Sequence, residues 1–321
     1  MLAVTYDGPG EVNVREVPGP RMPKNGLLIE MRNASICGTD LHFYKGEWKA
    51  EKGIILGHDA CGRIEGTGKR VALEFMVWCG RCDFCLQGRE NLCSHLRFMG
   101  FHRNGFFAER IALPNENVCF LTEEIDDEEG ACLEPVALAL HTFNSLGASA
   151  NDWVTILGQG AVGLCMTQVA KARKCKVVAV DLYDYRLKLA DNFGADITVN
   201  AREQDVEKAV RSATGRGSHF VVEAAGSRSS VEQSPSLARA GGRVALVGAF
   251  GGEINFKDEV LFSNINAYTV SEKRQALKLV AKGTIDVKSM ISHRFSLSEF
   301  KDAVTTALEP SKRAVKILIH P

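Results

Sequence analysis

A glycine-rich turn between a predicted strand and a predicted helix limits what this chain can fold into more than any other feature. The turn reads Gly158-Gln-Gly160-Ala-Val-Gly163, directly after the strand 153–157 and at the start of the helix 161–173. Gly158 permits the tight turn, Gly160 lets the backbone approach a pyrophosphate, and Gly163 permits close contact between helix and strand. The pattern therefore predicts a dinucleotide-binding unit on a parallel sheet.

The residues around this turn specify the cofactor further. Free N–H groups at the N-terminus of the helix, from Ala161 and Val162, suit the phosphates of a dinucleotide. Asp181 ends the next predicted strand, at about the twenty-residue offset where a carboxylate binds ribose hydroxyls. Such a carboxylate repels a 2′-phosphate, so NAD is favoured over NADP, and Arg186 is expected on the adenosine side of the cofactor or facing solvent. The alternative, a glycine-rich turn with a capping aspartate, is disfavoured by the strand–turn–helix context.

Strands and helices alternate from residue 152 onward, and the last short segment of this rhythm is predicted at 267–270. The rhythm is typical of a parallel sheet covered by helices on both faces. Residues 1–125 instead contain short alternating or apolar runs separated by glycine and proline turns, which indicates an irregular, mostly β domain. The chain is therefore predicted to be an α/β protein of two domains.

The overall charge gives no support for a nucleic acid or an anionic membrane as a partner. Lys plus Arg balance Asp plus Glu at 39 each in 321 residues, whereas such partners call for a basic patch. No signal-peptide pattern stands at Met1, and no apolar run is long enough to span a bilayer. We therefore expect a cytoplasmic protein with no nucleic-acid or membrane partner.

Four of the ten cysteines crowd into one short segment, Cys79-x2-Cys82-x2-Cys85-x7-Cys93. Four thiolates spaced in this way can surround one tetrahedral Zn²⁺, and a closed four-sulfur site leaves no position for a substrate, so its role would be structural. Disulfides are disfavoured by the cytoplasmic expectation, and the spacing alone does not exclude an iron–sulfur cluster. A zinc-ribbon nucleic-acid module would need a basic stripe, whereas this segment mixes basic and acidic residues. Structural zinc is favoured.

Three further motifs combine good zinc ligands with carboxylates. They are Cys37-Gly-Thr39-Asp-Leu-His42, Gly57-His58-Asp59 and Glu134-Pro135. Together with the four cysteines and the glycine-rich turn, these motifs resemble the zinc-containing medium-chain alcohol and polyol dehydrogenases, in family order and over nearly the whole chain. The Glu-Pro pair is closest to the sorbitol (polyol) and threonine dehydrogenase branch, since other alcohol dehydrogenases of the family carry a cysteine there.

The resemblance implies a fold and its boundaries. A GroES-like, mostly β catalytic domain would span 1–125 and carry the zinc sites. A Rossmann NAD-binding domain with a doubly wound parallel sheet would span 126–270, and 271–321 would return to the catalytic domain. A homodimer or homotetramer fits the family and the general preference for symmetric assemblies.

The resemblance also implies two zinc ions per chain, one structural and one catalytic. The catalytic ligands would come from Cys37, His58, Asp59 and Glu134, with one position left for the substrate hydroxyl, which zinc binds as a Lewis acid. The carboxylates can bind directly or through water. Asp59 departs from the family, which usually has Glu after this histidine, so direct ligation by its shorter side chain is less favoured.

The remaining implications concern the reaction. Thr39 resembles the family's hydroxyl relay beside the substrate, and His42 would pass the proton to solvent. The implied reaction transfers a hydride from a secondary alcohol (a polyol, cyclitol or amino alcohol) to NAD and gives a ketone. The alternative is a zinc-stabilised, NAD-binding protein of the same fold with lost or altered catalysis. Asp59 motivates it, as does the stretch 62–71, which is shorter than the hairpin usual in the family.

Overall fold

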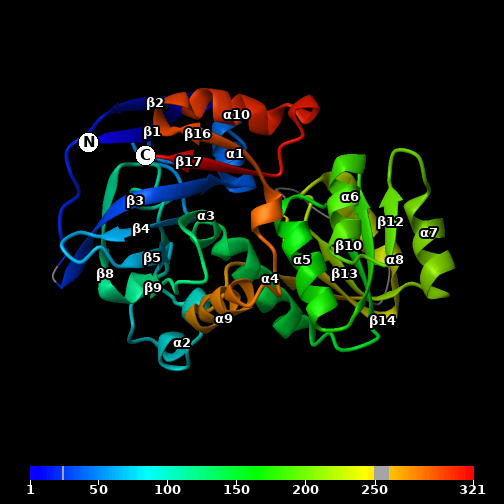
Figure 1. Cartoon of the computed structure of the whole chain (residues 1–321). Coiled ribbons are helices and arrows are strands. Elements are labelled where there is room, and N and C mark those ends of the chain that lie inside the picture. Colours follow the sequence, from blue (N-terminus) through cyan, green and yellow to red (C-terminus); the bar gives the residue numbers. More distant parts are fainter. Residues whose placement is uncertain (24, 249–259) are drawn as a thin grey trace. The chain divides into compact units, whose positions relative to one another are not determined.

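The computed structural model describes residues 1–23, 25–248 and 260–321. The chain forms two compact units, Met1–Glu134 together with Thr269–Pro321, and Pro135–Tyr268. In Figure 1 the red C-terminal strand lies among the blue strands of the first unit. The domain ranges inferred from the resemblance follow the same order along the chain and stay a prediction.

The first unit is built on a sheet that the C-terminal residues of the chain complete. Its strand order is β16-β17-β3-β4-β5-β9, and β8 pairs with β3. These strands are β16 (Ile291–Ser296), β17 (Lys316–His320), β3 (Gly26–Ile36), β4 (Ala60–Ile64), β5 (Arg70–Leu73), β9 (Val118–Phe120) and β8 (Arg110–Pro114). The β16–β17 pair is parallel and the other pairs are antiparallel. Three buried residues of β17, Ile317 to Ile319, pair with β3, so both ends of the chain share one core.

Smaller elements surround this sheet. Two antiparallel pairs join β1 (Leu2–Gly8) to β2 (Glu11–Glu16) and β6 (Met76–Val77) to β7 (Arg97–Phe98). The helices are α1 (Gly38–Tyr44), α2 (Asp83–Leu86), α3 (Asp127–Gly130), α9 (Val270–Ala281) and α10 (Phe300–Leu308). Residues 267–270, the last segment of the predicted alternation, form no strand, and only Val270 belongs to a helix, α9. Thr269 instead caps α9, and its hydroxyl and the Glu272 carboxylate form a capping box.

The second unit is a doubly wound parallel sheet, as predicted. Its order is β12-β11-β10-β13-β14-β15, with every described pair parallel. The strands are β10 (Trp153–Leu157), β11 (Lys176–Asp181), β12 (Ile197–Asn200), β13 (Ser218–Glu223), β14 (Ala238–Leu246) and β15 (Leu261–Asn264). They alternate with α5 (Ala161–Ala172), α6 (Asp184–Asn192), α7 (Val206–Thr214) and α8 (Arg228–Leu237), while α4 (Leu133–Leu146) precedes β10 (Figure 1). Neither here nor elsewhere in the described residues is a helix long and apolar enough to cross a bilayer.

The order of the strands places the expected ligand site of this unit. From β10 the chain proceeds to β11 and β12 on one side, whereas β13, β14 and β15 lie on the other side. The strand order therefore reverses between β10 and β13. In open parallel sheets ligands bind outside the carboxyl ends of the strands at such a point.

Candidate functional site

The four clustered cysteines lie together in a short lobe formed by α2 and the turns that flank it. Their sulfur atoms all lie within 4.8 Å of one another. The Cys82 Sγ is 3.4 Å from the Cys85 Sγ, and the Cys79 Sγ is 3.9 Å from it. The backbone N–H groups of Cys79 and His95 donate to the Cys93 Sγ, each at 3.3 Å. Four converging sulfurs with backbone donors fit one tetrahedral zinc ion of the closed, structural kind.

A thiol and an imidazole meet at the end of β3. Cys37 caps the N-terminus of α1, and its backbone N–H donates to the Asp40 Oδ2 at 2.9 Å. His58 is buried, and its Nδ1 lies 3.7 Å from the Asp40 Oδ1. Burial by itself lowers the pKa of His58, but the negative charges of Cys37 and Asp40 raise that pKa well above its ordinary value. This negative environment around a buried imidazole suits a cation.

Asp40 is a site residue that sequence reasoning missed. Its Oδ2 accepts from the Cys37 backbone N–H, and its Oδ1 lies 3.7 Å from the His58 Nδ1, which has no hydrogen-bond partner among the described residues. This is the position of the outer carboxylate that orients a metal-binding histidine. The available signal was its position in the Cys37-Gly-Thr39-Asp40 motif. Two aromatic rings, Phe75 and Phe101, complete the surroundings of His58, with centroids 5.5 and 5.3 Å from its ring.

The two carboxylates of the expected zinc site have different surroundings. The Asp59 Oδ2 accepts a hydrogen bond from the Ser35 hydroxyl at 2.8 Å and another from the Lys316 ammonium at 3.0 Å. The Glu134 carboxylate lies in the first turn of α4 and is buried. Burial raises the pKa of Glu134, and the charge of Asp59 adds to that rise.

The expected catalytic ligands lie in one neighbourhood. Their donor atoms are not yet close enough together to coordinate one metal ion. Charges on Asp59 and His58 both act on Glu134, and those on Cys37 and Asp40 act on His58. Among the described residues, however, only the four cysteines of the lobe form a group of three or more donors within 4.8 Å. A carboxylate has to turn before the Cys37 and His58 pair gains a third donor.

Thr39 and His42 lie on α1, directly after Cys37. The Cys37 thiol donates to the Thr39 hydroxyl at 3.9 Å. The His42 Nδ1 contacts the Glu47 carboxylate, and its ring stacks on Trp48 with a centroid distance of 5.2 Å and an interplanar angle of 18°. The side chain of His42 remains 24% exposed. A half-buried imidazole held by a carboxylate and an indole is well placed to exchange a proton with solvent.

The glycine-rich turn has the shape that its sequence predicts. Gly158 has a φ of +89°, and a Cβ there would lie 2.8 Å from the Ala225 backbone nitrogen. A Cβ on Gly163 would lie only 1.8 Å from the Gly158 carbonyl oxygen. Gly160 caps α5 and has no atom within 4 Å of its would-be Cβ. Two glycines are therefore required by packing inside the protein, while the third leaves open space at a helix N-terminus, which fits a pyrophosphate.

Asp181 ends β11, and its carboxylate holds this turn by hydrogen bonds. Its Oδ2 accepts from the Gln159 backbone N–H at 2.6 Å, and its Oδ1 accepts from the N–H groups of Leu182 and Tyr183 at 2.7 and 3.0 Å. The Arg186 guanidinium lies 3.6 Å from the Asp181 Oδ2 and also over the Tyr183 ring. Asp181 thus places a negative charge at the end of the strand beside the turn.

Glu223, at the end of β13, is a second residue that sequence reasoning missed. It is fully buried, and its Oε1 accepts from the backbone N–H groups of Ala225 and Gly226 at 2.9 Å each and from the Ser230 hydroxyl at 2.7 Å. Its Oε2 has no hydrogen-bond partner in the described part of the chain. Because Ala225 packs against Gly158, Glu223 organises the loop that faces the dinucleotide turn.

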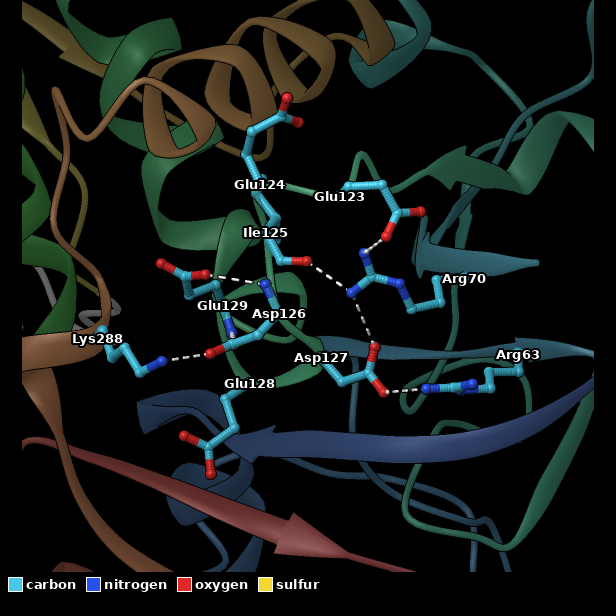
Figure 2. Close-up of a pocket in the computed structure, with 10 residues that line it drawn as sticks. All are labelled: Arg63, Arg70, Glu123, Glu124, Ile125, Asp126, Asp127, Glu128, Glu129 and Lys288. Carbon is cyan, nitrogen blue, oxygen red and sulfur yellow. Dashed lines mark hydrogen bonds and ion pairs between the residues drawn. The ribbon is translucent and has the colours of Figure 1, made fainter. Parts of the chain in front are cut away.

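A separate polar pocket of about 730 Å³ lies on the first unit and holds none of the predicted site residues. Figure 2 shows the guanidinium groups of Arg63 and Arg70 directed at Asp127, at 3.3 and 3.4 Å, and Lys288 paired with Asp126. These cations are bound by the carboxylates of the pocket itself. The pocket therefore has the features of a surface ion-pair network rather than of an active site.

Two family models match the two parts of this architecture. Residues 23–123 match the alcohol dehydrogenase GroES-like domain, and residues 161–283 match the zinc-binding dehydrogenase domain. A sorbitol dehydrogenase of Halalkalibacterium halodurans is 31% identical over 340 residues, which cover 100% of this chain and 98% of that protein. The chain belongs to the zinc-containing medium-chain dehydrogenase family. The expected family, the GroES-like and Rossmann fold, and the oxidoreductase class are confirmed.

Further relatives place the dehydrogenase within this family. An L-threonine 3-dehydrogenase of Bacillus subtilis is 31% identical over 338 residues, covering 98% of this chain and 96% of that protein. A crystal structure of a zinc-binding dehydrogenase from Sinorhizobium meliloti, bound to NADP, has a TM-score of 0.91 and 32% identity, covering 100% of this chain and 99% of that one. The dehydrogenase therefore resembles a sorbitol dehydrogenase and an L-threonine 3-dehydrogenase over nearly their whole length.

Proposed function

We propose that this dehydrogenase oxidises a secondary alcohol of a polyol, cyclitol or amino alcohol to a ketone, with NAD as the hydride acceptor. The observation that carries the proposal is the buried His58 imidazole beside the Asp40 carboxylate, in a neighbourhood that Cys37 and the buried carboxylates Asp59 and Glu134 share, in a chain that also has a complete dinucleotide turn. Sorbitol and threonine dehydrogenases among its relatives support the substrate class. We further propose a cytoplasmic homodimer or homotetramer, as is usual for symmetric assemblies.

Cys37, His58 and Glu134 are proposed to hold the catalytic zinc. When bound there, zinc acts as a Lewis acid that lowers the pKa of the substrate hydroxyl. The Asp40 carboxylate accepts from the Cys37 backbone N–H and lies 3.7 Å from the His58 Nδ1, where it is proposed to orient the ring. The four cysteines of the lobe, Cys79, Cys82, Cys85 and Cys93, are proposed to hold the structural zinc.

The proton of the substrate hydroxyl is proposed to leave along α1. The Thr39 hydroxyl lies next to Cys37 and can accept this proton from the substrate while donating its own. His42, one helical turn further on, faces solvent and is oriented by Glu47 and Trp48. An imidazole can accept a proton at one ring nitrogen and release one to water, so His42 can complete this path.

The cofactor is proposed to lie across the turn after β10. The open space at Gly160 and the free N–H groups of Ala161 and Val162 receive the pyrophosphate. The Asp181 carboxylate receives the ribose hydroxyls, and Arg186 lies on the adenosine side. A relative of the same fold holds NADP, but the negative charge at Asp181 repels a 2′-phosphate and favours NAD here.

An NADH-absorbance screen over polyols, cyclitols, amino alcohols and simple alcohols tests the proposal on zinc-loaded protein. We expect turnover with at least one secondary alcohol and a loss of kcat/KM of more than about 100-fold in Cys37→Ser, because it removes a metal ligand. Cys175→Ser, a substitution of a buried thiol in the second unit, is the matched control and should retain activity. NAD binding without turnover of any alcohol would favour the alternative of a zinc-stabilised protein that lost this catalysis. Full activity in Cys37→Ser would instead show that the reaction does not depend on a metal held by Cys37.

A further inference from the structure

A buried ion pair lies beside the proposed catalytic metal site. Lys316 begins β17, and Asp59 directly precedes β4. Their side chains are only 3% and 2% exposed, and the Lys316 Nζ is 3.0 Å from the Asp59 Oδ2. The same oxygen accepts the Ser35 hydroxyl at 2.8 Å. Removing one partner of such a pair leaves an uncompensated buried charge, so the carboxylate is bound firmly.

The backbone of Asp59 is fixed as well as its side chain. The Ser35 backbone N–H donates to the Asp59 carbonyl oxygen at 2.9 Å, next to the ladder that joins β3 to β4. The Ser35 Oγ also lies 3.0 Å from the Ala131 carbonyl oxygen, in the segment before α4, and its single proton is shared between this oxygen and the nearer Asp59 Oδ2. An aspartate has only one methylene between the backbone and the carboxylate. Its Oδ2 therefore cannot turn toward a metal without losing both donors.

Glu134 is in the opposite situation. It is buried in the same neighbourhood, yet its carboxylate makes no hydrogen bond or ion pair with the described residues. A metal at Cys37 and His58 must recruit a third protein donor. Turning Glu134 breaks no interaction of this kind, whereas turning Asp59 breaks two.

We propose that Lys316 is a positioning residue that keeps the Asp59 carboxylate out of the coordination shell of the catalytic metal. The protein ligands are then Cys37, His58 and Glu134, and Asp59 acts from outside the shell. The inference rests on the proposed function, because it assumes a metal at Cys37 and His58. A purely structural ion pair between β17 and the start of β4 is the competing explanation, and it predicts no change at the metal.

Visible absorption of Co²⁺ at the catalytic site separates the two explanations, since the intensity and position of its ligand-field bands depend on the number and kind of ligands. The full-length protein is loaded with Co²⁺ after selective removal of the catalytic zinc. The variants are Lys316→Met, Asp59→Asn and the double variant. Lys273→Met is the control for loss of a buried ammonium in the first unit. Its Nζ lies 3.8 Å from the Glu74 carboxylate, and although its charge also acts on Glu134, it does not pair with Asp59.

We expect Asp59→Asn to keep the wild-type bands, with Co²⁺ affinity reduced by about 10- to 100-fold, as loss of an outer partner does. Lys316→Met frees the carboxylate, so its bands should shift toward weaker, higher-coordinate absorption, and the double variant should restore them. Lys273→Met should not shift them. Shifted bands in Asp59→Asn, or wild-type bands in folded Lys316→Met, would overturn the inference.

Two further outcomes have a defined meaning. If Lys316→Met does not fold, Asp59→Asn still tests the ligand assignment on which the inference depends. Unchanged bands then support Asp59 outside the shell, and shifted bands place it inside and overturn the inference. If Cys37→Ser leaves the Co²⁺ bands unchanged, the metal is not at Cys37, and the proposed function fails rather than the role of Lys316. The absorption measurement needs no turnover, so these failures are distinguishable.

Discussion

Two glycines of the dinucleotide turn should respond in opposite ways to one added methyl group. In Gly163→Ala the new Cβ would lie 1.8 Å from the Gly158 carbonyl oxygen and 2.8 Å from its carbonyl carbon. Non-bonded atoms at this separation repel strongly, so the turn and α5 must move apart by more than about 1 Å. Overpacking of this kind costs about 1–3 kcal/mol of folding free energy.

Gly160→Ala should leave the free energy of unfolding almost unchanged. No atom lies within 4 Å of the would-be Cβ, and the φ of −71° is open to alanine. Reduced freedom of the unfolded chain stabilises by about 0.4–1 kcal/mol, while alanine caps a helix less well than glycine by a similar amount. The methyl group does fill the space proposed for the pyrophosphate. NAD binding should therefore weaken at least about tenfold, which is about 1.4 kcal/mol.

Urea unfolding and NADH fluorescence titration of both variants measure these two effects. Gly163→Ala is expected to unfold at lower urea, and Gly160→Ala is expected to unfold like the wild type while binding NADH poorly. Equal NADH affinity in Gly160→Ala would refute the proposed position of the pyrophosphate. Wild-type stability in Gly163→Ala would show that the contact to Gly158 relaxes without cost.

Three other predictions concern single residues. Cys93→Ser should reduce the zinc content from two ions to about one per chain and lower the Tm, measured by elemental analysis and thermal unfolding, since a closed four-cysteine site contributes folding energy. Asp181→Ser should raise kcat/KM for NADP relative to NAD, because the repulsion of a 2′-phosphate is gone, and an unchanged ratio would count against its role. Burial raises the pKa of Glu223 above its ordinary value, so the folded state should lose stability as pH rises from the ordinary carboxyl range through that raised pKa. Glu223→Gln removes this loss, and urea unfolding of both proteins at about pH 5 and pH 8 would show a smaller difference in the variant.

The features that could be predicted from the sequence are those set by short-range geometry. Gly158 and Gly163 meet steric limits imposed by neighbours in the same strand–turn–helix unit, and the four cysteines surround one point because their spacing closes a single lobe. Each of these local constraints requires one residue type at a fixed spacing in the sequence, so it can be recognised as a motif. The parallel sheet could be predicted for the same reason, since β10, α5 and β11 alternate at regular lengths.

Contacts that join distant segments could not be predicted in this way. Lys316 lies 257 residues from Asp59 in sequence, and no periodicity of either segment shows that β17 joins the sheet of β3. In the sequence, Glu223 is only the last residue of an apolar strand. The fold shows that its carboxylate accepts hydrogen bonds from the loop beside Gly158. The helix α9 is different, because Thr269 and Glu272 form a capping box that its sequence already shows.

The ion pair between Lys316 and Asp59 also bears on the charge of the proposed metal centre. A thiolate at Cys37, a carboxylate at Glu134 and a neutral imidazole at His58 together balance the two positive charges of Zn²⁺. Asp59 inside the shell would add a further negative charge and weaken the attraction that lowers the pKa of a substrate hydroxyl. The Lys316 ammonium neutralises the Asp59 carboxylate outside the shell. Burial alone would lower the pKa of Lys316, but the charge of Asp59 raises that pKa above its ordinary value. The pair therefore keeps a carboxylate beside the centre without cost to the Lewis acidity on which the proposed reaction depends.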